Sequence, residues 1–117
     1  MGAEHQNLKQ FEVVTRELPG GGTELKVRGE LDLATVEGFE GPLAAAIDSA
    51  YGGQVVVDFG ECGFVDSVGV RALIRGARRL DGSGRTLRIS GARAQVRDLF
   101  NLIVLDEARS IDFNDDE

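Results

Sequence analysis

Residues 54–80 read QVVVDFGECGFVDSVGVRALIRGARRL, and this stretch decides the fold. Its first six residues form a short apolar run that is typical of a buried central strand. Over residues 68–80 apolar residues recur at helical spacing, which predicts a helix with one face suited to packing against a core. That face consists of Val70, Leu73, Ile74, Ala77 and Leu80. A short connection between strand and helix therefore brings Asp66 and Ser67 to the point where the helix begins.

Ser67 is expected at the positive end of that helix, where the first backbone N–H groups have no partner within the helix. Two roles fit a hydroxyl in this position. It can be the N-cap of the helix, which is the commoner role of a serine at a helix start. It can also carry a phosphate, whose charge the helix dipole and the free N–H groups would favour. The local residues leave both roles open.

The amino-terminal part of the chain predicts a hairpin followed by a helix. Residues 11–18 and 23–29 flank the turn-forming cluster at 19–22, which favours an antiparallel pair of strands. Apolar residues then recur at helical spacing from Val36 to Ala50, with Thr35 as a candidate cap. Glycines interrupt the beginning of this pattern, so the firm part of the helix is expected to start at Pro42. Gly52 and Gly53 are expected to end it.

The carboxyl-terminal part continues the alternation of strands and helices. Residues 86–90 predict a strand, 92–102 a third helix and 110–113 a last edge strand. Helices between strands require crossover connections, so the fold class is α/β with a mixed, mainly parallel sheet, an N-terminal antiparallel hairpin and three or four helices. We expect one domain over residues 1–117, with its core at about 9–113 and flexible ends at 1–8 and 114–117.

Composition excludes several classes of function. The net charge of −7 argues against sequence-independent binding of nucleic acid, which needs a basic surface. No apolar run approaches the roughly 20 residues of a membrane helix, and residues 1–10 lack the apolar part of a secretory signal, so we expect a cytoplasmic protein without membrane insertion. Cys62 and His5 are the only cysteine and histidine. We therefore expect no catalytic residue, bound cofactor or metal ion in this chain.

Asp58 and the arginines after Ser67 each have an alternative interpretation. Asp58 lies at the end of an apolar strand, as does the phosphate-accepting aspartate of a response-regulator receiver. Receivers also need an acidic pair that holds magnesium and a late lysine, which this chain lacks, so Asp58 is expected to bind loop amides instead. The arginines at 71, 75, 78 and 79 share a second face of the helix with Val68. This face is either solvated or part of a surface that pairs with carboxylates of a partner.

Two motifs in the chain resemble those of a known family. Gly29-Glu30-Leu31-Asp32, and the segment 55–69 with its Asp66-Ser67, are similar to motifs of the STAS domains, specifically the free-standing bacterial anti-sigma factor antagonists. The resemblance covers about residues 9–113. The chain differs from the family pattern at Val68, where serine or threonine is common, and at Val104, where glycine is usual.

The resemblance implies a regulator of transcription that acts by binding and is not an enzyme. Its partner would be an anti-sigma factor that is a serine kinase, which binds ATP and magnesium itself, and the antagonist would release the sigma factor until Ser67 is phosphorylated. A phosphatase would reset Ser67. The expected partner-binding residues are Asp32, Asp66, Val68, Gly69, Arg71 and Arg75. The alternative is a STAS accessory subunit of a membrane transporter ATPase that acts without a phosphorylation cycle, and the oligomeric state stays open.

Overall fold

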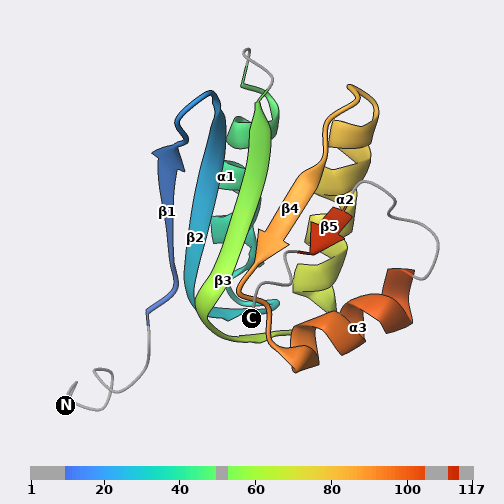
Figure 1. The fold of residues 1–117 in the computed structure, drawn as a ribbon. Helices are drawn as coiled ribbons and strands as arrows, with labels where there is room; N and C mark the ends of the chain where they lie inside the picture. Colours follow the sequence, from blue (N-terminus) through green and yellow to red (C-terminus); the bar gives the residue numbers. More distant parts are fainter. Residues whose placement is uncertain (1–9, 50–52, 105–110, 114–117) are drawn as a thin grey trace.

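Five strands form one mixed sheet whose spatial order follows the chain (Figure 1). They are β1 (Glu12–Glu17), β2 (Gly22–Leu31), β3 (Gln54–Val65), β4 (Leu87–Ser90) and β5 (Ile111–Phe113). β1 pairs with β2 in antiparallel fashion, and every later pair of neighbours is parallel. The computed structural model describes residues 10–49, 53–104 and 111–113. The predicted order of elements and the mixed sheet with its N-terminal hairpin are confirmed.

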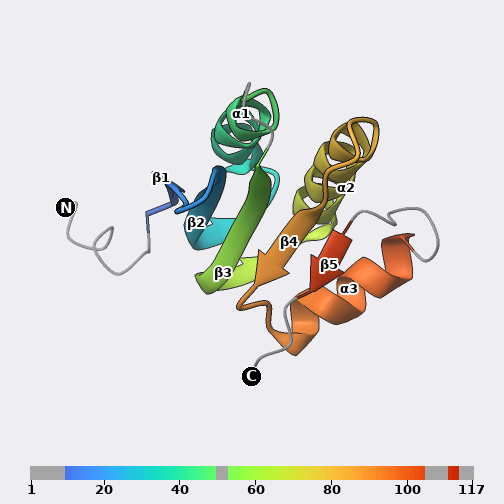
Figure 2. The ribbon, with the colours of Figure 1, turned by 45° about the horizontal axis from the view of Figure 1, so that its top comes forward.

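The helices are α1 (Val36–Ile47), α2 (Ser67–Asp81) and α3 (Ala94–Val104). Figure 2 shows α1 and α2 side by side on one face of the sheet. Their close approach depends on Gly76, because a Cβ atom there would lie 2.9 Å from Leu43 Cδ2. α3 packs against α2 and against β3. This arrangement gathers the carboxyl-terminal ends of β2 and β3, the beginning of α2 and the beginning of α3 at one end of the molecule (Figure 1).

The core lies between the sheet and the α1–α2 layer. Alternate residues of β2 are buried, as the sequence pattern predicts, and they meet the apolar face of α2. All five residues predicted for that face are buried. The largest side chains with almost no exposed surface include Phe39, Phe59, Leu25 and Leu73. Burial of these side chains is the main force that holds both helices on the sheet.

β3 is longer than its apolar run predicts, because it continues to Val65 instead of ending at residue 59. Its pairing with β2 shifts register twice, and β3 contains one extra residue at each shift. The first shift lies between the pairs Lys26–Asp58 and Arg28–Glu61, and the second lies just before Phe64. Each extra residue breaks the alternation of buried and exposed side chains. The second half of the strand therefore has no strand-like pattern in the sequence.

α1 begins at Val36, six residues before the expected start, and contains Pro42 in its interior. Two observations explain the difference. The Asp32 carboxylate accepts hydrogen bonds from the amides just before the helix, and the buried side chains of Val36 and Phe39 hold its first turns against the core. Packing of this kind outweighs the weak helix preference of the residues between them. α1 ends at Ile47 with Asp48 as its C-cap, so the expected end at Gly52 and Gly53 is too late.

Arg85 fixes the carboxyl-terminal end of α1. Its guanidinium donates to the carbonyl oxygen of Ile47 at 2.8 Å and to that of Gly53 at 2.9 and 3.1 Å. These bonds satisfy one of the last carbonyls of the helix and tie the helix to the residue just before β3.

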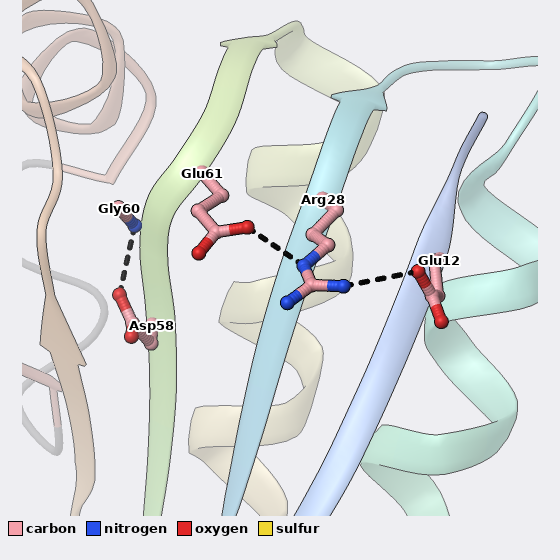
Figure 3. Close-up of polar contacts among 5 residues, drawn as sticks. All are labelled: Glu12, Arg28, Asp58, Gly60 and Glu61. Carbon is pink, nitrogen blue, oxygen red and sulfur yellow. Dashed lines mark hydrogen bonds and ion pairs between the residues drawn. The ribbon is translucent and has the colours of Figure 1, made fainter. Parts of the chain in front are cut away.

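The face of the sheet away from α1 and α2 is charged (Figure 3). Arg28 bridges three strands there, with its Nε 2.7 Å from Glu61 Oε1 and a terminal nitrogen 3.4 Å from Glu12 Oε1. Within the described residues the same face carries the Arg16–Glu24 pair on β1 and β2. Such exposed pairs contribute little stability, but they keep a broad sheet surface polar.

Candidate functional site

Asp66 is the N-cap of α2. Its backbone is extended, and its Oδ1 accepts hydrogen bonds from the amides of Val68 at 2.9 Å and Gly69 at 3.0 Å. The Asp66 amide in turn donates to the carbonyl of Leu31 at 3.0 Å, which ties the helix start to the end of β2. The interpretation of Ser67 as the N-cap is therefore wrong, because the carboxylate one residue earlier makes those bonds.

Ser67 is the first residue of α2 and is partly exposed. Its hydroxyl makes no hydrogen bond with any residue in the described ranges, and capping does not require it. The fold therefore places no structural demand on this hydroxyl within the described residues. Asp66 occupies the amides of Val68 and Gly69, so fewer free helix N–H groups stand beside Ser67 than the sequence suggests.

Asp32 organises the neighbouring connection in a similar way. Its Oδ1 accepts from the amides of Ala34 at 3.0 Å and Thr35 at 3.2 Å. Thr35 makes no side-chain cap bond to α1; its hydroxyl donates to the carbonyl of Glu30 at 2.7 Å. Because Leu31 pairs with Val65 in the sheet, Asp32 and Asp66 follow two paired residues and leave the sheet side by side. Two carboxylates thus lie at the edge from which Ser67 emerges.

Gly69 lies in the packing beneath this edge. It is buried, and a Cβ atom there would lie 2.7 Å from Leu31 Cγ and 2.9 Å from Val65 Cγ1. The missing side chain lets the first turn of α2 approach the ends of β2 and β3. Gly69 therefore positions Ser67 and offers no side chain to a partner.

Three apolar side chains surround this edge. Leu33 is 74% exposed and Phe64 is 42% exposed, and Val68 in the first turn of α2 is partly buried against the core. We call Leu33, Phe64 and Val68 the apolar rim. Val68 was expected from the sequence, but Leu33 and Phe64 were not. Leu33 stands alone in a connection, and Phe64 follows the bulges that hide the strand pattern.

The arginines of α2 form an exposed stripe, and two of them pair with α1. Arg75 forms an ion pair with Glu40 and Arg79 with Asp48. Arg75, predicted to bind a partner, thus already joins two helices. Arg71 is exposed and contributes to a groove of about 430 Å³ between α2 and α3. The other residues that line it are Ile74, Arg75, Arg78 and Ile103.

Asp58 and Cys62 do not contribute to this site. Asp58 lies on the charged face of the sheet within β3, not at its end, and its Oδ1 accepts from the amide of Gly60 at 2.8 Å (Figure 3). Cys62 is buried, its Sγ lies 3.4 Å from the carbonyl oxygen of Phe64, and burial raises the pKa of its thiol. A thiol of this kind is poorly reactive.

Two further findings concern larger classes of function. Across residues 10–49, 53–104 and 111–113, no group of three or more His, Cys, Asp or Glu side chains is arranged to hold a metal ion. None of the helices in those ranges has both the length and the apolar character needed to cross a membrane.

The family model described as Mlab, STAS domain matches residues 14–111. The chain therefore belongs to the STAS domain family, as its motifs predict. A search of curated proteins by sequence finds no significant match.

Solved structures of anti-sigma factor antagonists share the fold. SpoIIAA in its unphosphorylated form is 23% identical, with 93% of this chain and 89% of SpoIIAA covered and a TM-score of 0.64. The phosphorylated form, from Bacillus, is also 23% identical, with 92% of each chain covered and a TM-score of 0.61. An anti-sigma factor antagonist from Mycobacterium paratuberculosis is 19% identical, with 88% and 86% covered and a TM-score of 0.74.

The fold also occurs as part of a larger protein. The murine solute carrier 26 family member A9, an anion transporter, is 16% identical over 93% of this chain and 21% of the transporter, with a TM-score of 0.66. At these identities the likenesses show a common fold.

Proposed function

We propose that this protein is an anti-sigma factor antagonist that acts in the bacterial cytoplasm by binding an anti-sigma factor serine kinase and thereby releasing the sigma factor. Phosphorylation of Ser67 by that kinase, which uses its own ATP and magnesium, ends the binding, and a phosphatase restores it. One observation carries the proposal. The hydroxyl of Ser67 is partly exposed at the start of α2 and is unused, because Asp66 caps the helix.

The surface around Ser67 suits a partner while the serine is unmodified. The apolar rim supplies area that a partner can bury, and exposed apolar side chains near the centre of an interface carry much of its binding energy. Arg71 supplies a cation one helical turn away, which can pair with a carboxylate of the partner.

A phosphate on Ser67 would change the charge of this surface. It adds between one and a half and two negative charges at neutral pH, beside the carboxylates of Asp66 and Asp32. An apolar or acidic partner surface then meets an uncompensated negative patch. We expect the affinity to fall by at least about tenfold, which corresponds to about 1.4 kcal/mol.

Incubation with the candidate kinase tests this directly. The purified chain is mixed with an anti-sigma factor serine kinase from the same genome, ATP and magnesium, and mass spectrometry locates any added phosphate. We expect one phosphate, on Ser67. Ser83→Ala is the matched control, because Ser83 is another exposed serine and its replacement should leave the phosphate in place. Phosphate on another residue, or none, would count against the proposal.

Binding of two variants completes the test. Ser67→Ala should bind the kinase as tightly as the unsubstituted chain and should stay active, whereas Ser67→Asp should bind at least about tenfold more weakly. Equal affinities would favour the second candidate, an accessory subunit of a transporter ATPase that acts without phosphorylation. Two observations favour that candidate: Val68 replaces the serine or threonine common in antagonists, and the fold forms part of an anion transporter.

A further inference from the structure

We propose that Arg71 holds the phosphate of phosphorylated Ser67, so that modification of Ser67 also withdraws Arg71 from the partner surface. This inference rests on the proposed function in one respect: it assumes that Ser67 is phosphorylated. It adds the identity of the residue that receives the phosphate and a second consequence of the modification.

Most of the amides at the start of α2 already donate hydrogen bonds to Asp66. Among the first four amides of α2, those of Val68 and Gly69 donate to Asp66 Oδ1, and that of Val70 donates to the Asp66 carbonyl at 3.0 Å. A phosphate on Ser67 would thus lie beside a carboxylate, with three of the four amides already occupied. With only the Ser67 amide left, most of the compensation for its charge falls to a side chain.

Arg71 is placed to compensate the charge of a phosphate on Ser67. Residues four apart lie on the same side of a helix, and helical side chains lean toward the amino-terminal end, so Arg71 leans back toward Ser67. An acidic group four residues before a basic one is the favourable order. Arg71 is exposed, whereas Arg75 lies a further turn away and pairs with Glu40. The guanidinium fork also matches a phosphate in shape.

Arg93 is another arginine near this edge, but it already has a hydrogen-bond partner. Arg93 lies just before α3, and its Nε donates to the carbonyl of Cys62 at 3.3 Å. That bond supports the bulged end of β3, so Arg93 already has a structural role. Arg71 in turn lines the groove between α2 and α3. If Arg71 moves to the phosphate, the groove loses a cation. This loss adds to the effect of the phosphate itself, which places negative charge at the apolar rim.

The test installs phosphoserine at position 67 during translation, by genetic encoding, so that no kinase is needed. Titration by ³¹P NMR then measures the second pKa of the phosphate. We expect this pKa to be about 0.2 to 0.4 unit lower in the unsubstituted chain than in Arg71→Gln, the shift that one such helical pair produces. Arg71→Lys should keep most of the difference, and 0.5 M NaCl should reduce it, because the pair is exposed.

Arg75→Gln is the matched control and should leave the pKa unchanged. An unchanged pKa in Arg71→Gln, or an equal rise in Arg75→Gln or Arg93→Gln, would overturn the assignment to Arg71. Because the phosphate is installed without the kinase, these results do not depend on whether the kinase recognises Ser67. A chain that fails the kinase test and still shows the Arg71 shift would refute the proposed function alone.

Discussion

Replacement of Gly69 by alanine tests how closely the start of α2 is packed against the sheet. The new methyl group would lie 2.7 Å from Leu31 Cγ and 2.9 Å from Val65 Cγ1, well inside van der Waals contact. Both neighbours are fully buried and have no solvent-exposed space to move into. Overpacking of this kind costs about 1–3 kcal/mol. Within a helix, alanine is about 0.5–1 kcal/mol more favourable than glycine. We therefore expect the free energy of unfolding to fall by about 1 kcal/mol in total.

Gly41→Ala is the matched control. Gly41 is an exposed glycine inside α1, and a Cβ atom there would have no neighbour within 4 Å. Because Gly41 precedes Pro42, whose ring disfavours a Cβ atom on a helical residue before it, this variant should gain less than the roughly 0.5–1 kcal/mol of helix preference. Since both variants carry the same chemical change, the amount by which Gly69→Ala falls below Gly41→Ala gives a lower limit for the steric cost at Gly69.

Urea unfolding at equilibrium measures both free energies, with the slope of the transition required to stay the same. Thermal unfolding provides a check, because 1 kcal/mol corresponds to roughly 4 °C in a domain of this size. A Gly69→Ala variant as stable as Gly41→Ala would refute the argument, since it would mean that α2 is free to move away from β2 and β3.

Two further predictions concern Asp66 and Cys62. Asp66→Ala should lower the free energy of unfolding by about 1 kcal/mol, whereas Asp66→Asn should change it little because asparagine also caps helices; equal losses in urea unfolding would contradict the capping role. Burial raises the pKa of the Cys62 thiol, so above its ordinary pKa the unfolded chain binds fewer protons than the native one, and stability should fall as pH rises. Cys62→Ala should abolish this part of the loss of stability at alkaline pH. In the unsubstituted chain the thiol should react with Ellman's reagent only as fast as the fold opens. Rapid labelling at pH 8 would show that Cys62 is accessible.

The sequence predicted those parts of the fold in which burial follows a simple period. Alternate residues of β2 and the apolar face of α2 repeat at the intervals of strand and helix, and both elements were found as expected. The start of α1 was not, because contacts with Asp32 and the core hold a segment whose glycines and Pro42 suggest an interruption. The role of Arg85 was also not predictable, since its acceptors lie more than thirty residues earlier in the chain.

The candidate site was predicted in its residues but only partly in its geometry. Spacing placed Ser67 at the start of a helix and the family motif placed Asp66 and Asp32 nearby. The choice between Asp66 and Ser67 as the N-cap depends on a shift of one residue, which spacing does not determine. Leu33 and Phe64 escaped notice because exposure is a property of the folded surface, and neither residue stands in a pattern that reveals it.

The two extra residues in β3 make the length of this segment matter more than the identity of its residues. Deletion of Gly60 or Gly63 would change the phase of the strand, so that Val65 would turn outward and Ser67 would leave the sheet on the opposite side. We expect such a deletion to displace the proposed binding surface around Ser67 as well as the buried Val65.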